Sequence, residues 1–330
     1  MSNFKLFKFL CLTGLLALAI SSSAACTGPA TGYKPSGLPG SIAFASDRDK
    51  NIHIYTINPD GSDVLPTSDD NRTVDGLPRW SPDGSKMVFS SNQSGNYQIW
   101  SMSADGSDRK RLSDLKGRSA LPRWSPDGSK IVFTSEVLNA AGDKDLEIFV
   151  MNSDGSGVQQ LTVSPAVAAV GGAGHSENER MAWNSVPAWS PDSSKILFSS
   201  NRDGDAVTPI LYIMNSDGSD QKKFGLFVTV DGSEPDWSPV TNKIVCVRGT
   251  AAKGDIWVMD ASSPLPTLTA RKITENIDDN RSPVWSPDGK QIAYVSDVNG
   301  NRDVYIMNAD GAGVRRLTYG KSNNISPAWR

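Results

Sequence analysis

The chain has 330 residues, of which 38% are hydrophobic and 21% are charged, and its formal net charge is −3. This is the composition of an ordinary folded protein, and it lacks the clustered basic excess that nucleic-acid-binding proteins carry. A chain of this length usually forms about two domains, unless internal repeats share one continuous core.

The first 25 residues have the layout of a secretory signal peptide. Lys5 and Lys8 give a positively charged N-terminal region, an apolar stretch runs from Phe9 to Ile20, and small residues follow from Ser21 to Ala25. The apolar stretch is shorter than the roughly 18 residues of a membrane span, and no other segment approaches that length. The sequence therefore predicts an exported protein on the periplasmic or extracellular side of a membrane.

Cys26 follows the signal directly, in the sequence Ser23-Ala24-Ala25-Cys26. This sequence resembles a bacterial lipobox, in which the cysteine is lipidated and becomes the new N-terminus, although Ser23 stands where the lipobox prefers Leu. The alternative is ordinary cleavage near Ala25, which leaves a free thiol. Residues 26–40 are rich in Gly, Pro, Ser and Thr, and this composition predicts a flexible linker that would serve as the tether of a lipid anchor.

One motif recurs along the rest of the chain. It occurs as WSPDGSKMVF at 80–89, WSPDGSKIVF at 124–133, WSPDSSKILF at 189–198, WSPVTNKIVC at 237–246 and WSPDGKQIAY at 285–294. Trp329 begins a sixth copy, and the successive tryptophans are 44, 65, 48, 48 and 44 residues apart. This spacing is the length of one four-stranded propeller blade. Cys246 stands where other copies have Phe or Tyr, so we expect a buried residue that is a poor disulfide partner for Cys26.

A second motif occurs six times and alternates with the first along the chain. It reads IYTINPDG at 54–61 and returns in chain order as IWSMSADG, IFVMNSDG, LYIMNSDG, IWVMDASS and VYIMNADG. Segments such as 130–135 (KIVFTS) place β-branched and aromatic residues between turn residues, which predicts strands. Ser-Pro-Asp-Gly and Asn-x-Asp-Gly predict type I turns with glycine at positive φ. Each repeat is thus predicted to be an antiparallel four-stranded blade whose tryptophan packs between neighbouring blades.

The phase of the repeats predicts how the ring closes. Residues 41–46 (SIAFAS) are equivalent to a second strand, and a third and a fourth follow. Residues 326–330 (SPAWR) are equivalent to a first strand. Three N-terminal strands and one C-terminal strand would complete a sixth blade and leave no open sheet edge between the ends. The predicted fold is therefore all-β, a six-bladed β-propeller over residues 41–330.

The repeated W-S-P-D-G and M-N-x-D-G motifs resemble the propeller repeat of the TolB family, named after the periplasmic component of the Tol–Pal envelope system. The resemblance covers about residues 41–330. It implies the propeller fold and the binding of envelope proteins, while similar repeats also occur in prolyl-oligopeptidase-type enzymes. TolB proteins carry an α/β domain before the propeller, whereas a signal and a linker are expected here, which leaves the link to the Tol–Pal system open.

Two kinds of loop define two faces of the predicted ring. The tight-turn face carries the two short turns of every blade. The variable-loop face carries the loops between second and third strands and those between blades, which differ in length, and binding residues often lie on such loops. The loops there that are longest in comparison with the equivalent loops of the other repeats are 136–145 and 162–185. The second contains His175, Glu177, Arg180 and Trp183, and is either a partner-binding loop with Arg180 and Trp183 as anchors or a tolerated insertion.

Charged residues on or just before the first strands form a further candidate group: Arg79, Arg123, Asp236, Asp279 and Arg281. Together with Asp278, they are predicted to lie at the channel mouth, either as a charged ring that receives a peptide or as a solvated rim.

Catalytic and metal-binding patterns are scarce. His53, predicted to be structural, and His175 are the two histidines of the chain, which argues against a Ser-His-Asp triad or a multi-histidine metal site. The short acidic loops at 143–145 and 203–205 are weak calcium candidates. We expect no metal and no cofactor.

The sequence therefore favours a non-catalytic, monomeric scaffold that binds another envelope protein or peptide through its variable-loop face. It predicts no nucleic-acid partner, and contact with a membrane only through a lipid on Cys26. Two alternatives stay open: a carbohydrate or ligand sensor, and an enzyme acting on an extracellular polysaccharide or peptide with acidic groups at the channel mouth.

Overall fold

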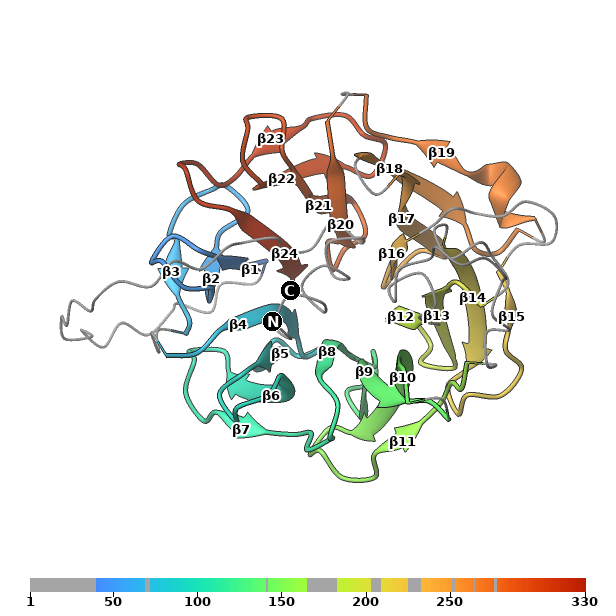
Figure 1. The fold of residues 1–330 in the computed structure, drawn as a ribbon. Coiled ribbons are helices and arrows are strands. Elements are labelled where there is room, and N and C mark those ends of the chain that lie inside the picture. The colour runs from blue at the N-terminus through green and yellow to red at the C-terminus, as the bar shows by residue number, and fades with distance from the viewer. Residues whose placement is uncertain are drawn as a thin grey trace, which may run out of the picture.

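The computed structural model describes residues 40–68, 72–140, 142–164, 183–202, 209–224, 233–250, 253–263, 265–275 and 278–330. Within these ranges the chain forms six four-stranded antiparallel sheets that stand around a common centre (Figure 1). The predicted six-bladed β-propeller is confirmed. We name the sheets blades A to F in chain order.

The strands of blades A to C are given from the innermost outward. Blade A contains β24 (Asn324–Trp329), β1 (Ile42–Ser46), β2 (His53–Ile57) and β3 (Leu65–Pro66). Blade B contains β4 (Asp75–Trp80), β5 (Lys86–Ser91), β6 (Gln98–Ser103) and β7 (Lys110–Arg111). Blade C contains β8 (Ser119–Trp124), β9 (Lys130–Leu138), β10 (Lys144–Asn152) and β11 (Gln159–Gln160).

Blades D to F repeat this order. Blade D contains β12 (Asn184–Trp189), β13 (Lys195–Ser200), β14 (Ile210–Asn215) and β15 (Lys222–Lys223). Blade E contains β16 (Ser233–Trp237), β17 (Lys243–Thr250), β18 (Lys253–Asp260) and β19 (Arg271–Lys272), with a 3-10 turn, η2 (Pro266–Thr269), before its last strand. Blade F contains β20 (Asn280–Trp285), β21 (Gln291–Ser296), β22 (Asp303–Asn308) and β23 (Arg315–Arg316).

Blade A closes the ring as predicted. β24 pairs antiparallel with β1, with Ile42 opposite Trp329 and Ser46 opposite Asn324. The Arg330 backbone N–H donates to the Ser41 carbonyl at 3.2 Å. The C-terminal strand therefore lies beside the first N-terminal strand, and the red and blue ribbons meet in one sheet (Figure 1).

Each blade is buried on both faces because it lies between two neighbours. Ile131, Val132 and Phe133, three consecutive residues of β9, are each 0% exposed, which explains why second strands are continuous apolar runs. Trp189 of blade D packs with Val132 of blade C in one cluster, and the other first-strand tryptophans bridge neighbouring blades in the same way. The predicted role of the tryptophans is confirmed.

Aromatic pairs recur between the second and third strands. Phe133 and Phe149 have ring centroids 5.7 Å apart, and Phe198 and Tyr212 have theirs 5.6 Å apart. In blade E the position is taken by Cys246, which lies opposite Trp257. Cys246 is a free, fully buried thiol, and burial raises its pKa to about 12. The prediction of a small buried residue at this position is confirmed.

The Ser-Pro-Asp-Gly turns place their fourth residue at positive φ. Gly84, Gly128 and Gly289 have φ of 68°, 73° and 66°. Blade D has Ser193 instead, at φ 60°, a conformation that costs a residue with a Cβ about 1–2 kcal/mol.

Replacing Ser193 by Gly should therefore stabilise the protein by about 0.5–1 kcal/mol, because the strain is released. The gain is reduced by loss of the Ser193 hydroxyl, which accepts a hydrogen bond from the Asp127 N–H at 3.2 Å. Urea denaturation would measure the difference. Gly128→Ser is the matched reverse change and should destabilise. A loss of stability in Ser193→Gly would show that the hydroxyl contact outweighs the strain.

The turn aspartates bind their own turns through hydrogen bonds. Asp83 accepts from the Ser81 hydroxyl at 2.5 Å and from the Ser85 N–H and hydroxyl at 3.0 and 2.7 Å. These bonds lower the pKa of Asp83 to about 2, and similar serine bonds lower the pKa of Asp127, Asp192 and Asp288.

These depressed pKa values predict acid sensitivity. A carboxyl whose pKa is lower in the folded than in the unfolded chain stabilises the fold above the unfolded pKa, here 3.8, and loses that contribution as the pH falls through the folded pKa. The melting temperature should therefore fall between about pH 4 and pH 2, and the fall should be smaller in Asp83→Asn. If the melting temperatures of wild type and Asp83→Asn fall equally with pH, the Asp83 turn does not contribute to the acid sensitivity.

All six first strands carry a bulge that the sequence analysis did not predict. In each, the third residue before the tryptophan has positive φ and precedes a proline: Leu77, Leu121, Val186, Glu234, Ser282 and Ser326, with φ of 51–57°. The register shifts at this point in every pairing between first and second strands. Proline has no N–H for the ladder, and a bulge redirects side chains. Leu77, Leu121 and Val186 consequently meet across three blades.

Candidate functional site

The charged candidates separate into two groups at opposite ends of the first strands. Arg79, Arg123 and Asp236 directly precede the tryptophan, at the end that leads into the tight turns. Asp279 and Arg281 lie at the start of β20, toward the variable-loop face. The prediction of one charged ring at one mouth is therefore wrong, because a first strand runs from one face of the ring to the other.

Arg123 and Asp236 form an ion pair across the axis. It joins blade C to blade E past blade D, and Arg123 also donates to the Pro235 carbonyl at 3.3 Å. The second carboxylate oxygen of Asp236 accepts from the Trp285 backbone N–H at 2.9 Å. Their side chains are 12% and 15% exposed, so this pair ties three blades together close to solvent.

Arg79 lies beside this pair but has no carboxylate partner among the described residues. Its Nη1 donates to the Pro78 and Pro327 carbonyls at 2.8 and 3.2 Å. Its Nε is buried and has no hydrogen-bond partner. Burial, with repulsion from Arg123, lowers the pKa of Arg79 to about 9.

Glu234 lies deeper on the axis, at the level of the bulges. It is 3% exposed, and its Oε2 accepts from the Ser282 N–H and hydroxyl at 2.5 and 3.0 Å, while its Oε1 has no hydrogen-bond partner. Burial raises the pKa of Glu234, against the opposing influence of the Arg281 charge. At the level of the bulges, the side chains of blades B, C and D are thus apolar, whereas Glu234 of blade E and Ser282 of blade F form a polar pair.

Asp279 and Arg281 are internal supports of a long hairpin. Arg281 is 3% exposed, and its Nε donates to Asp279 at 2.6 Å while its Nη2 donates to the Thr250 carbonyl at 2.7 Å. Asp279 accepts from the Gly254 N–H at 2.8 Å. Both residues therefore fix the β17–β18 hairpin to β20, and the prediction of a solvent-facing charged ring is wrong for them because this hairpin covers them.

The variable-loop face carries two hairpins that are longer than the rest. β9 and β10 have nine residues each and β17 and β18 have eight, whereas the corresponding strands of blades B, D and F have six. Leu138 at the end of β9 is 71% exposed, and Val163, after β11, is 75% exposed. Leu138 lies in the 136–145 segment and Val163 in the 162–185 segment, both of which the sequence singled out, but neither side chain was among the predicted site residues.

Trp183 is the one interface candidate of the 162–185 segment that the structure describes. It is 6% exposed and forms an isolated parallel β-bridge with Leu146. Its backbone N–H donates to the Asn201 side-chain oxygen at 2.8 Å. Trp183, predicted as one anchor of a partner-binding loop, is therefore packed at the entrance to β12 and presents little surface to a partner. His175, Glu177, Arg180 and Cys26, with the signal, the linker and the 203–205 loop, lie outside the described residues.

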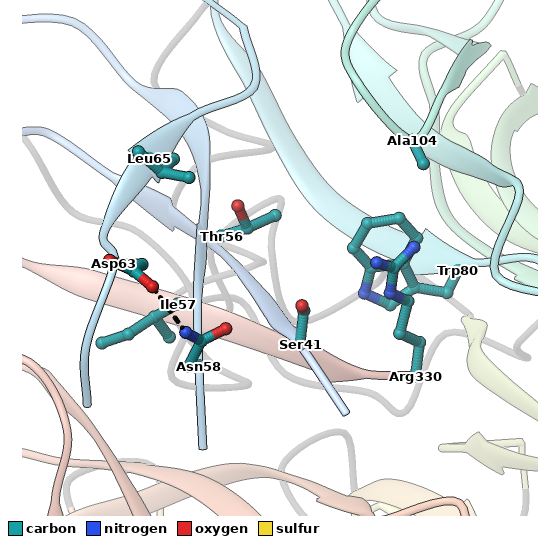
Figure 2. Close-up of a pocket in the computed structure, with 9 residues that line it drawn as sticks. All are labelled: Ser41, Thr56, Ile57, Asn58, Asp63, Leu65, Trp80, Ala104 and Arg330. Carbon is teal, nitrogen blue, oxygen red and sulfur yellow. Dashed lines mark hydrogen bonds between the residues drawn. The ribbon is translucent and has the colours of Figure 1, made fainter. Parts of the chain in front are cut away.

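A pocket lies on the tight-turn face at the seam of the ring (Figure 2). It has a volume of about 340 Å³, counting the solvent at its mouth, and lies between blade A and blade B. The Arg330 guanidinium stacks 4.4 Å over the Trp80 ring and donates to the Gly84 carbonyl at 2.7 Å. These contacts join the two blades, so the pocket belongs to the closure of the ring.

His53 stands at the start of β2 and is 1% exposed, as expected of a structural residue, although neither ring nitrogen has a hydrogen-bond partner. The described part of the chain holds no group of three or more His, Cys, Asp or Glu residues arranged for a metal ion. Its helical content includes nothing long and apolar enough to cross a membrane.

Several relatives match parts of the chain. An uncharacterized protein of Agrobacterium fabrum is 33% identical over 171 residues, which are 51% of this chain and 53% of that protein. A Tol-Pal system protein TolB of Anaeromyxobacter dehalogenans is 44% identical over 46 residues, 14% of this chain and 11% of that protein. This chain therefore matches about half the length of the first relative and a small part of the second.

Solved structures share the fold. TolB from Acinetobacter baumannii superposes with a TM-score of 0.67 and 20% identity over 88% of this chain and 66% of that one. A nidogen/laminin complex chain gives a TM-score of 0.64 at 12% identity over 88% and 98% of the two chains, and an oligogalacturonate lyase from Vibrio parahaemolyticus gives 0.53 at 15% over 83% and 73%. At these identities the likeness concerns the fold alone.

The sequence profile of the TolB beta propeller domain matches residues 18–166, 107–263 and 209–330. These overlapping matches span all six repeats and agree with the blades seen in the structure. The chain belongs to the TolB beta propeller domain family.

Proposed function

We propose that this protein is an exported, non-catalytic scaffold of the cell envelope that binds another protein or peptide through the blade C part of its variable-loop face. The observation that carries the proposal is the lengthened β9–β10 hairpin with Leu138 and Val163, 71% and 75% exposed, at the same end of one blade. Rigid strands that present apolar side chains beyond a ring suit protein recognition. The name of the Anaeromyxobacter relative, a Tol-Pal system protein, supports an envelope partner.

Surface substitutions test this proposal without disturbing the core. Leu138→Asp with Val163→Asp should remove the partner from a pull-down of envelope extract, because two charges would have to be desolvated at the interface. The matched control is Val240→Asp with Val314→Asp on the tight-turn face, where these side chains are 61% and 57% exposed. Identical partner sets for the two double variants and wild type would show that blade C is not the binding surface.

The exported state and the lipid anchor rest on the sequence of the first 26 residues. Mass spectrometry of the mature N-terminus tests both: export requires cleavage near Ala25, and anchoring requires a lipid on Cys26. A mature chain with an unmodified Cys26 would contradict the lipid anchor and leave the proposal of an exported scaffold without a membrane tether.

A further inference from the structure

The pocket between blades A and B, which we call the seam pocket, lies where blade A departs from the other blades (Figure 2). In blades B, E and F the fourth strand begins with a lysine or arginine that donates to a turn carbonyl of the next blade. These contacts join Lys110 to Asp154 at 3.0 Å, Arg271 to Asp310 at 3.2 Å, and Arg315 to Pro59. Blade A has Leu65 at this position, and leucine has no donor for such a contact. Leu65 instead lines the seam pocket, together with Ala104 of the blade B turn.

Two further features of blade A leave room at the same place. Thr56, opposite Leu65 on the third strand, is equivalent to Ile213 of blade D and Ile306 of blade F, which are larger. No tight turn joins β24 to β1, whereas a short turn joins the first and second strands of the other blades. The seam pocket thus follows from residues and a connection that are particular to the closing blade.

The lining of the seam pocket combines apolar walls with donors and acceptors of hydrogen bonds. Ile57, Leu65 and Ala104 provide the apolar part. The polar part consists of two hydroxyls, one amide, one carboxylate and one guanidinium, which belong to Ser41, Thr56, Asn58, Asp63 and Arg330. A ligand with both hydroxyl groups and C–H surface would match both parts, because hydroxyls donate and accept.

The two charges of the lining lie on opposite sides of the pocket, with Asp63 on one side and Arg330 on the other (Figure 2). The Asp63 carboxylate accepts from the Asn58 amide at 2.9 Å. The Arg330 guanidinium stacks on Trp80 and donates to the Gly84 carbonyl at 2.7 Å. A charged ligand would be attracted by one of these groups and repelled by the other. The lining therefore favours a ligand without charge.

We propose that the seam pocket binds a neutral sugar residue. A sugar ring carries neighbouring hydroxyls for the carboxylate, amide, guanidinium and hydroxyl groups, and its C–H surface suits the apolar walls. The volume of about 340 Å³, counting the solvent at the mouth, is near the lower end of the range of about 300–1,000 Å³ for small-molecule sites. It therefore suits one ring, either a free monosaccharide or the terminal residue of a glycan.

Neutral monosaccharides test this proposal directly. D-Glucose, D-galactose, D-mannose and N-acetyl-D-glucosamine would be titrated against the protein and followed by saturation-transfer NMR. At least one of them should bind saturably to wild type. Cyclohexanol keeps the ring size but lacks the neighbouring hydroxyls, so it should not compete. If none of the four sugars binds, the proposal is wrong.

Substitutions taken from other blades locate the binding. Thr56→Ile introduces the residue of blades D and F and should weaken binding of the sugar by about tenfold or more, because it fills the pocket and removes a hydroxyl. Leu65→Lys introduces the residue of blade B and should have a similar effect, since lysine can extend toward the Ala104 turn. The matched control is Ser101→Ile, at the position of blade B that is equivalent to Thr56. This variant should bind the sugar as wild type does, and melting temperatures would show that all three variants fold.

Other outcomes would overturn the proposal. If Thr56→Ile and Leu65→Lys bind the sugar as tightly as wild type, the sugar does not occupy the seam pocket. If glycine or acetate displaces the sugar, the pocket selects charged groups and the argument for a neutral ligand is wrong.

The methyl glycoside of the sugar that binds distinguishes the two sources, because its methyl group stands where a glycan would continue. Binding as tight as that of the free sugar would identify the terminal residue of a glycan as a ligand, and lost binding would identify a free monosaccharide. The seam pocket opens on the tight-turn face, opposite to Leu138 and Val163. A negative result with sugars therefore leaves the proposed protein-binding surface untouched, and the two proposals fail independently.

Discussion

A chain truncated after Lys321 is expected to lose its cooperative thermal transition. The deletion removes β24, which supplies the pairing partner of β1 and places Ile325 and Ala328, 4% and 2% exposed, in the core. It also removes Trp329, which packs with residues of blades F and A. Large-to-small changes at such positions cost about 2–5 kcal/mol each, so losing the strand should cost ~5–10 kcal/mol, similar to the whole stability of a typical domain.

Calorimetry and circular dichroism would measure this loss. The control is Arg330→Ala, which keeps β24 and removes only the stacking on Trp80 and the bond to the Gly84 carbonyl; it should cost about 1–2 kcal/mol. A synthetic peptide of residues 322–330 added to the truncated chain should restore part of the transition by supplying the missing strand. A truncated chain that melts like wild type would mean that closure by β24 does not hold the ring.

The sequence was sufficient to predict this closure because its signals are local and repeated. The tight turn after the tryptophan has a proline in all five copies and a glycine in three, which fix its geometry, and each blade has one tryptophan at a fixed place. Trp329 stands in a first-strand motif and residues 41–46 in a second-strand motif, so the repeats predicted that these two ends pair. The pairing of β24 with β1 confirms this prediction.

The sequence was less informative about the axis. Alternation along a strand predicts where side chains point only if the ladder is regular, and a bulge at Leu77 and its five equivalents breaks that count. The pairing of Arg123 with Asp236 joins residues 113 positions apart across the ring, so no local pattern indicates it. Only the recurring x-Pro-x-Trp pattern before each tight turn carried a signal of the bulge.

A buried polar arrangement near the variable-loop end was also missed, although its parts recur in the sequence. In blades B, C, E and F a polar residue near the start of the third strand binds a serine or threonine after the fourth strand: Gln98 with Ser113, Glu147 with Thr162, Asp255 with Thr274, and Asp303 with Thr318. In blades C and F an asparagine of the next first strand joins the pair. Each hydroxyl also accepts a strand N–H, at 2.8–3.1 Å.

Replacing Glu147 by Ala should destabilise the protein by about 3–4 kcal/mol, the second largest effect we expect. Glu147 is 1% exposed and accepts hydrogen bonds from Thr162 at 2.5 Å, from the Ser164 N–H at 2.6 Å and from Asn184 at 2.9 Å. Its removal leaves three donors without a partner at the junction of blades C and D, and each buried unsatisfied donor costs about 1–3 kcal/mol. Urea denaturation of wild type and variant would measure the difference.

Blade B supplies the matched control for this change. Gln98 holds the equivalent place and accepts from Ser113 at 2.7 Å and from the Leu115 N–H at 3.1 Å, so an amide can fill the position. Glu147→Gln should therefore cost only about 1–2 kcal/mol: its oxygen can keep the bonds from Thr162 and Asn184, which share one carboxylate oxygen of Glu147, while its NH₂ group would face the donating Ser164 N–H. If Ala and Gln at this position cost the same, packing volume and not the hydrogen-bonded acceptor would be what residue 147 contributes to the junction of the two blades.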